Sequence, residues 1–223
     1  ASASSFAVIA CATVIEEMQS HLPPGMEAHV LDFGLHVNPR ELKRLLQEAV
    51  DTISPLVDTI LLGYGLCSMA VVGLQATDCT LVVPKVDDCI AIFLGSGAAY
   101  RRQARKEPGT YYLTKGWIEA GDGPFDEYDR LVEQYGEKKA RWIMDQMLKN
   151  YTRLALINTG QYEMEPYREY GRCTAARFGL RYEEIPGSDE LVKKLLHGPW
   201  DDQFIVAPPG HTIAYLDFRD SAG

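Results

Sequence analysis

The chain has no CxxC pair and no zinc-finger spacing, although it contains five cysteines among 223 residues. This absence argues against a small structural zinc module. An odd number of cysteines, with no secretory signal, also argues against a disulfide framework. We therefore expect reduced thiols in a cytoplasmic protein.

Long apolar runs and an excess of positive charge are lacking as well. The longest apolar stretches, FAVIACATVI and DTILLGYGLC, fall short of the roughly 18 residues that a membrane span needs. The formal net charge is −9, and the basic cluster RRQARK at 101–106 reads as a solvated helix face. These features predict a protein that binds neither a membrane nor nucleic acid.

Motifs for nucleotide binding and for common hydrolases are also missing. The sequence contains no GxGxxG, no Walker loop, no GxSxG elbow and no HExxH. Nucleotide-dependent chemistry and serine hydrolysis therefore gain no support from the sequence.

What the sequence does contain is a regular alternation of strand-like and helix-like segments. Strands are expected at 6–11, 27–33, 58–65, 80–86, 110–114, 153–160, 180–187 and 203–210. Helices are expected at 12–22, 38–53, 68–76, 88–106, 125–136, 137–151, 165–179 and 188–198, the fourth of them unbroken or interrupted at 95–97. The alternation predicts an α/β fold with parallel sheets flanked by helices.

Two arrangements satisfy this pattern: two Rossmann-like lobes with a cleft between them, or one doubly wound sheet. With two lobes, residues 1–106 form the first and carry the cysteine site. Residues 107–150 form a crossing segment with two helices, and 151–223 form the second lobe.

Three of the five cysteines share one topological position, just past the end of a predicted strand. Cys11 closes FAVIAC, Cys67 closes TILLGYGLC, and Cys89 closes TLVVPKVDDC. The carboxyl ends of neighbouring parallel strands converge on one crevice, so we expect these thiols to lie close together. Each also precedes a predicted helix, whose N-terminus would lower the thiol pKa. Cys79 and Cys173 lack this placement and read as structural.

Other candidate site residues lie in the same strand-end loops. Tyr64 precedes Cys67 and offers a hydrogen bond to a substrate, although a packed aromatic is the alternative. Asp88, beside Cys89, is a candidate general base or a plain helix N-cap. His36 follows the second strand and is a candidate ligand or acid/base. Thr159 is expected to face the cleft from the second lobe, whereas His211 reads as a turn residue.

Several motifs resemble, in order, a family known as domain of unknown function 1638. IACATV, LDFGLH, LLGYGLC, DDCIAIFLGS and GTYYLTKGWIE carry the resemblance, and NTGQYE, YEEIPGS and FIVAPPG extend it to about residue 210. Ala12 stands where the family pattern has glycine, and Asp87 where it has histidine. The family has no established activity. Its members are often encoded beside corrinoid-dependent methyltransferases of anaerobes, which implies one-carbon or methylamine-type metabolism.

Three cysteines from separate loops point to a soft metal, because thiolates are poor ligands for magnesium and calcium. They can hold a [4Fe-4S] cluster with one iron open to substrate, which is the first expectation. They can equally hold Zn²⁺ with an exchangeable fourth position. The spacing alone does not separate these two metal centres.

Three function classes follow. The first is a metal-dependent enzyme, of lyase or transferase type, that activates a small-molecule substrate at Cys11, Cys67 and Cys89. The second is an accessory protein that partners a corrinoid protein or a methyltransferase. The third is a metal-free sensor of a small ligand, in which the thiols stay unligated.

Overall fold

The structure is a computed structural model that describes residues 5–121 and 123–219. The chain divides into two compact units. The first comprises the described residues up to Ala99 together with those from Ser188 onward, and the second is Tyr100–Gly187. Each unit has its own sheet, so the predicted α/β class with two mostly parallel sheets flanked by helices is confirmed.

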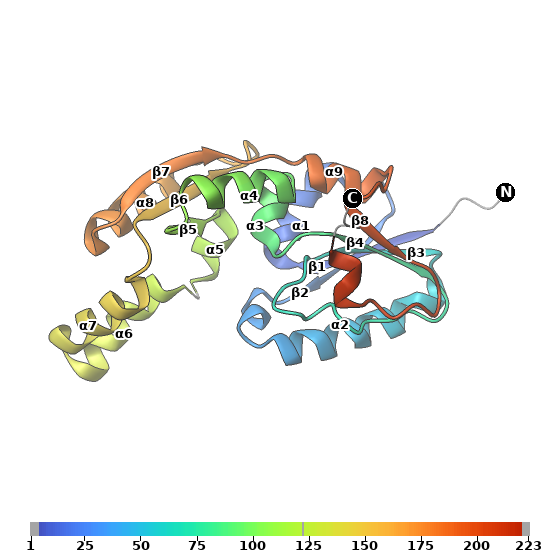
Figure 1. The fold of residues 1–223 in the computed structure, drawn as a ribbon, viewed down its shortest axis with the longest axis horizontal. Helices are drawn as coiled ribbons and strands as arrows, with labels where there is room; N and C mark the ends of the chain where they lie inside the picture. The colour runs from blue at the N-terminus through green and yellow to red at the C-terminus, as the bar shows by residue number, and fades with distance from the viewer. Residues whose placement is uncertain (1–4, 122, 220–223) are drawn as a thin grey trace. The chain divides into compact units, whose positions relative to one another are not determined.

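The first unit is built on a five-stranded sheet in the order β2-β1-β3-β4-β8 (Figure 1). Its strands are β1 (Phe6–Cys11), β2 (Glu27–Leu31), β3 (Thr59–Gly63), β4 (Thr80–Pro84) and β8 (Phe204–Ala207). Its helices are α1 (Ala12–Met18), α2 (Pro39–Ile53), α3 (Cys89–Phe93) and α9 (Glu190–His197). The first four strands are parallel, and β8 runs antiparallel to β4 at the edge.

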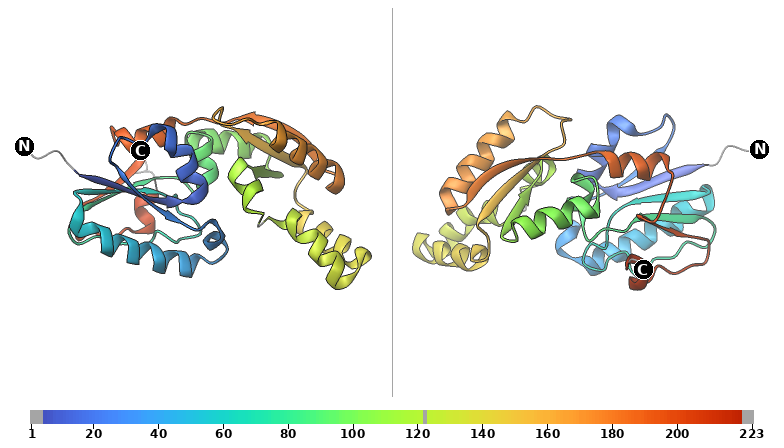
Figure 2. Two further views of the ribbon diagram at one scale, coloured as in Figure 1. Left: turned by 180° about the vertical axis from the view of Figure 1, so that it is seen from behind. Right: turned by 45° about the horizontal axis from the view of Figure 1, so that its top comes forward.

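Alternate residues of the central strands face opposite layers of helices. Ile9 and Leu62 belong to the core cluster that contains Leu46 of α2. Ala10 and Gly63 point to the other face, where a Cβ on Gly63 would lie 2.5 Å from that of Ala10. Figures 1 and 2 show α2 on one face of this sheet and α1 with α9 on the other. Burial on both faces explains why these strands read as continuous apolar runs.

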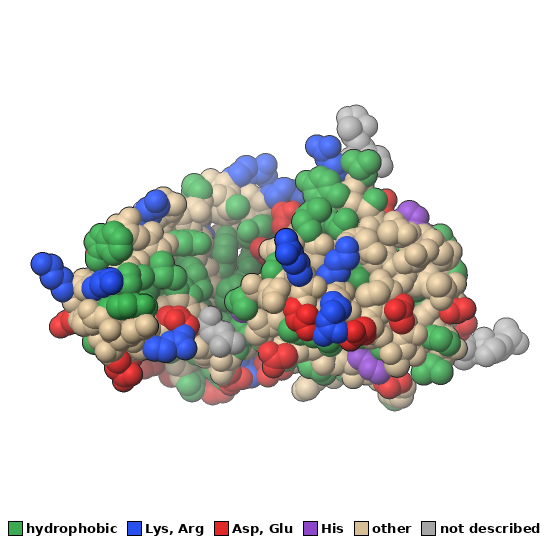
Figure 3. Space-filling view, turned by 90° about the horizontal axis from the view of Figure 1, so that it is seen from below, with side chains coloured by type: hydrophobic (Ala, Val, Ile, Leu, Met, Phe, Trp, Pro, Cys, Tyr) green, Lys and Arg blue, Asp and Glu red, His purple; other side chains and the backbone are tan. Residues whose placement is uncertain are grey.

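Helix α2 begins as its sequence predicts, and its solvent side carries paired charges. The Asn38 side-chain oxygen accepts the Glu41 N–H at 3.3 Å, and Pro39 occupies the first turn. On the solvent side Arg44 pairs with Glu41 and Glu48. Figure 3 shows acidic and basic side chains next to one another on the face that it presents.

The second unit has a three-stranded parallel sheet in the order β5-β6-β7. Its strands are β5 (Thr110–Leu113), β6 (Arg153–Asn158) and β7 (Arg181–Pro186). Its helices are α5 (Lys115–Ala120), α6 (Pro124–Tyr135), α7 (Glu137–Leu148) and α8 (Glu165–Phe178), and α4 (Gly97–Lys106) leads into it. Residues of α6, α7 and α8 form a core with Leu154 and Leu156 of β6.

The division into units differs from the predicted one at the C-terminal end. We placed all of 151–223 in the second lobe, but β8 hydrogen-bonds to β4, and α9 lies against β3 and β4. The last part of the chain therefore completes the first unit. The segment 100–106 likewise belongs to the second unit rather than to the first.

The predicted short helix at 68–76 is wrong, because tertiary pairing replaces local helical bonding there. The Gly73 N–H donates to the Ile213 carbonyl at 2.7 Å, and the Ile213 N–H donates to the Leu74 carbonyl at 2.9 Å. The expected interruption near 95–97 is present, since Gly95 has φ of +81° between α3 and α4. Among the residues that the model covers, no helix is long and apolar enough to cross a membrane.

Candidate functional site

The three strand-end cysteines lie on adjacent strands or on the helix that follows one. Cys11 is the last residue of β1 and the N-cap residue of α1. Cys67 follows β3, and Cys89 is the first residue of α3, after β4. Because β1, β3 and β4 are neighbours and parallel, all three thiols are placed at the carboxyl edge of one sheet.

The loop after β3 is held against the loop after β4 by backbone hydrogen bonds. The Leu66 N–H donates to the Val86 carbonyl at 2.8 Å, and the Cys67 N–H donates to the Asp87 carbonyl at 2.9 Å. A Cβ on Gly65 would lie 2.6 Å from the Val86 oxygen, so only glycine permits this approach. Gly65 therefore allows the loops of Cys67 and Cys89 to come together.

Cys67 begins a left-handed turn. The prediction that it stands at the start of a helix is therefore wrong. Cys67, Ser68 and Met69 have φ of 45°, 55° and 74°, a region that residues with a side chain enter at a cost of about 1–2 kcal/mol each. The turn closes with the Ala70 N–H donating to the Cys67 carbonyl at 3.2 Å. Strained backbone of this kind is concentrated at functional sites in proteins, which makes the turn a relevant feature of the site.

Neighbouring acidic groups and burial act on two of the three thiols. Burial, with the charges of Asp88 and Cys11, raises the pKa of Cys67 to about 12, although a backbone hydrogen bond from Gly65 opposes the rise. Burial also raises the pKa of Cys89 well above its usual value, with added repulsion from Cys67, Asp88 and Cys11. The expectation that a helix N-terminus lowers the thiol pKa is therefore wrong for Cys67 and Cys89. Without a cation they remain protonated at neutral pH.

Tyr64 lies among the three cysteines. Its side chain is 4% exposed, and its hydroxyl is buried with no hydrogen-bond partner in the described structure. Burial raises the pKa of Tyr64, and the charges of Cys11, Cys67 and Cys89 raise it further. The hydroxyl is therefore a neutral donor directed at no protein acceptor, and burying such a group is costly unless something binds it.

Asp88 has one of the two roles that the sequence allowed, that of helix N-cap. Its Oδ1 accepts the Ile90 N–H at 2.9 Å, so it is the N-cap of α3. Burial raises the pKa of Asp88, although backbone hydrogen bonds from Ile90 and Ala91 oppose the rise. The carboxyl group acts on both Cys67 and Cys89, which places it beside the thiols.

His36 and Thr159 lie in two other loops, one in each unit. His36 lies in a 3-10 turn after β2, where its Nδ1 is 2.7 Å from the Phe33 carbonyl oxygen and its ring packs on that of Phe33. Thr159 follows β6 in the second unit, in a turn where the Gly160 N–H donates to the Asn158 side chain at 2.8 Å. Their roles at the site stay predictions.

The two remaining cysteines do not follow a strand: Cys79 directly precedes β4, and Cys173 lies within α8 of the second unit. Cys79 is buried in the core cluster on the α2 face of the first unit, and Cys173 is exposed on α8 with its Sγ 3.3 Å from Glu169 Oε1. Cys173 thus provides a thiol in the other unit that can serve as a control.

A metal centre requires several donor side chains arranged around one point. Within residues 5–121 and 123–219, no three or more His, Cys, Asp or Glu side chains are already arranged to hold a metal ion. The chemistry of these donor groups nevertheless fits a soft cation. Three partly buried thiols and the unpartnered hydroxyl of Tyr64 interact. The charges that raise the pKa of Cys67 and Cys89 all come from acidic groups. Thiolates in such a site need a cation to compensate them.

Comparison with known proteins agrees with the resemblance seen in the motifs. A search of curated proteins found no match. The family model described as "Protein of unknown function (DUF1638)" matches residues 30–196, which include Tyr64, Cys67 and Cys89, while Cys11 precedes the matched span. Since the match covers well over half of the chain, this protein belongs to the DUF1638 family.

Proposed function

We propose that Cys11, Cys67 and Cys89 bind a metal centre, a [4Fe-4S] cluster as first choice and Zn²⁺ as second. The observation that supports this proposal is the placement of the three thiols after three adjacent parallel strands, at one edge of the sheet. Formal charge does not separate the two centres, because both the oxidised cluster core and zinc carry two positive charges. Three ligands from three loops favour the cluster, since they leave one iron open.

The metal centre would supply a Lewis-acidic position for a small substrate. The residues of the chain would provide the rest of the site. The neutral hydroxyl of Tyr64 would donate a hydrogen bond to a substrate atom, since it has no acceptor in the described protein. Asp88, whose Oδ1 is engaged by the Ile90 N–H, would use its other oxygen to accept an N–H or a proton.

On this proposal the protein is a metal-dependent enzyme of lyase or transferase type. The family resemblance supports a place in anaerobic one-carbon or methylamine-type metabolism. An accessory protein that partners a corrinoid protein or a methyltransferase is the second candidate. It is favoured by the partial exposure of all three thiols, which suits transfer to or from a partner.

Anaerobic purification followed by iron, sulfide and zinc analysis and an absorption spectrum tests the proposal. We expect iron and acid-labile sulfide, or one zinc per chain. If the centre has an open position, added cyanide should change the spectrum of an iron-loaded sample. Protein that takes up neither metal under these conditions would contradict the proposal. A bound metal that is indifferent to every added ligand would favour the accessory role.

The charge of Asp88 can be tested separately from its capping role. Asp88→Asn keeps an oxygen for the Ile90 N–H, and asparagine is as good an N-cap as aspartate. The metal content is expected to stay the same, while cyanide binds severalfold more tightly because a nearby negative charge is lost. Spectral titration measures this affinity.

Asp87→Asn is the matched control for this experiment. Asp87 is exposed, so solvent screens its charge and a smaller change is expected. Equal effects of the two substitutions would show that Asp88 has no special position at the centre.

A further inference from the structure

The first unit contains a hollow at the end of its sheet opposite the cysteines. It has a volume of about 630 Å³, within the usual range for a small-molecule site. Phe6, the first residue of β1, lines it, whereas Cys11 is the last residue of that strand. Five residues of strand separate them by roughly 16 Å, so this hollow is distinct from the cysteine site.

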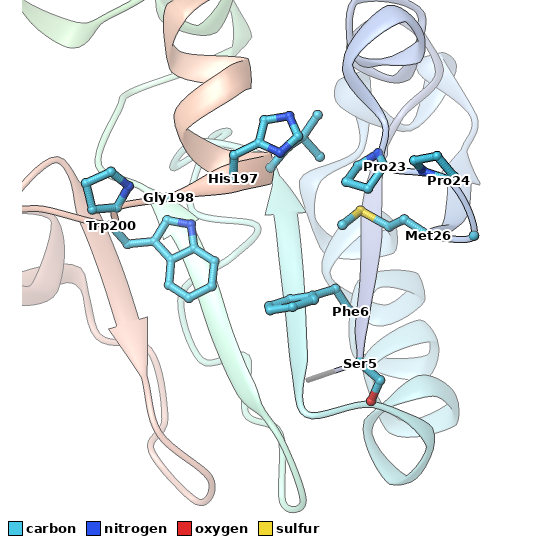
Figure 4. A pocket seen from close by; sticks show the side chains of 11 residues that line it. Ser5, Phe6, Pro23, Pro24, Met26, His197, Gly198 and Trp200 are labelled. Atoms are coloured by element: carbon cyan, nitrogen blue, oxygen red, sulfur yellow. The ribbon is translucent and has the colours of Figure 1, made fainter. Parts of the chain in front are cut away.

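Three connections of the chain converge on this hollow. The start of β1 contributes Phe6, the turn before β2 contributes Pro23, Pro24 and Met26, and the segment after α9 contributes Trp200. Figure 4 shows these side chains arranged around one open space. The walls are therefore formed by two aromatic rings, prolines and a thioether.

The aromatic walls are fixed in place before any ligand binds. The Trp200 Nε1–H donates to the Leu195 carbonyl at 3.0 Å, which sets the orientation of the indole. The rings of Phe6 and Trp200 meet edge to face, with centroids 6.2 Å apart and an interplanar angle of 64°. A rigid ring pair loses little conformational entropy when a ligand binds, which favours affinity.

The described wall of the hollow offers no side chain with a permanent charge. No lysine, arginine, aspartate or glutamate of the described residues lines it. The Ser5 hydroxyl is already engaged with the Asp58 carboxylate, and the backbone N–H of Ser5 donates to the same carboxylate at 2.8 Å. His197 is the other polar side chain in the wall, and it lies exposed. A charged ligand would therefore lose its hydration without finding a partner of opposite permanent charge.

We propose that this hollow is a binding site for a small, uncharged, planar aromatic molecule. Its flat ring packs against Phe6 and Trp200, and a hydrogen-bonding group on its rim faces the imidazole of His197. The site does not depend on a metal, so it goes beyond the function proposed for the cysteines.

Three probes of similar size distinguish the features that the site should recognise. Benzamide is planar and neutral, benzoate is planar and anionic, and cyclohexanecarboxamide is neutral but not planar. The chain has three tryptophans, and only Trp200 lines the hollow. Indole N–H resonances of ¹⁵N-tryptophan-labelled, metal-free protein therefore give a local readout, with the Trp200 signal assigned by Trp200→Phe.

Benzamide is expected to shift the Trp200 resonance saturably, while those of Trp117 and Trp142 stay in place. Cyclohexanecarboxamide should bind roughly three- to tenfold more weakly, the range that an aromatic contact contributes. Benzoate should also bind more weakly, because its charge would lose hydration without a partner of opposite permanent charge. Phe6→Leu keeps apolar volume but removes the ring, so it should weaken benzamide by a similar factor. Trp142→Phe, in the second unit, should leave the affinity unchanged.

Three results would overturn this assignment. They are the absence of a saturable shift up to the solubility limit of benzamide, equal affinity for the three probes, and unchanged benzamide affinity in folded Phe6→Leu protein. Since the samples contain no metal, none of these results bears on the cysteine site.

Discussion

Replacing Cys67 with serine is expected to lower the affinity of the protein for iron or zinc at least tenfold. A hydroxyl is a poor substitute for a soft thiolate, and the loop of Cys67 is hydrogen-bonded to the loop that precedes Cys89. Metal content after anaerobic purification and a zinc titration against a competing chelator measure the effect. Cys173→Ser is the matched control, because Cys173 lies exposed in the other unit. Equal metal content in the two variants would refute the assignment of the site.

The same titration has a pH dependence of predictable sign. A metal binds thiolates, but the Cys67 thiol of the metal-free protein has a pKa of about 12 and therefore carries a proton at neutral pH. Binding must release that proton, so affinity should rise as pH rises, by about tenfold per pH unit for each proton displaced. The slope should fall by one proton in Cys67→Ser. A merely structural role for this cysteine would leave the slope unchanged.

Arg153→Ala is expected to destabilise the second unit by about 1–3 kcal/mol, the usual cost of leaving buried hydrogen-bond partners unsatisfied. The Arg153 side chain is fully buried at the start of β6. Its Nε donates to Thr110 Oγ1 at 2.8 Å, its Nη1 to Glu183 Oε2 at 3.0 Å and its Nη2 to Gln103 Oε1 at 3.1 Å. Alanine leaves a cavity and removes this donor from Thr110 and Gln103, while Glu183 keeps the Arg181 guanidinium as a donor.

Urea unfolding followed by the fluorescence of Trp117 and Trp142 in a Trp200→Phe background measures this loss, since both indoles belong to the second unit. Arg172→Ala is the control, because Arg172 is half exposed and its pairs with Glu165 and Glu169 lie at the surface. It should cost less than about 1 kcal/mol. A comparable loss in the two variants would show that the buried network of Arg153 carries no special share of the stability.

The fold could be predicted wherever local chemistry and tertiary packing agree. Helix α2 has its Asn38 cap and a regular apolar face, and the sequence indicates both. The segment at 68–76 could not be predicted, because its short apolar sequence fits a helix equally well. Its actual path depends on pairing with Ile213, more than a hundred residues away. The same limit applies to β8, whose antiparallel place beside β4 is not encoded in its own residues.

The candidate site shows the same division. Position after a strand was enough to place Cys11, Cys67 and Cys89 at one edge of the sheet, because the rule for parallel sheets is topological. It was not enough to predict the left-handed turn at Cys67, which residues of that type rarely adopt. Nor could it predict the sign of the pKa shifts, since burial depends on how neighbouring loops close over each thiol.

The interrupted path of the first unit has a consequence for synthesis on the ribosome. Strand β4 ends at Pro84, and its edge partner β8 begins at Phe204, so about 120 residues must be translated between them. At roughly 5–20 residues per second, the hydrogen-bonding edge of β4 stays open for roughly 6–24 s while the second unit is made. An exposed edge can pair with another nascent chain. Rapid folding of the second unit, or a chaperone bound over β4, would therefore protect this protein from such pairing during translation more than at any later time.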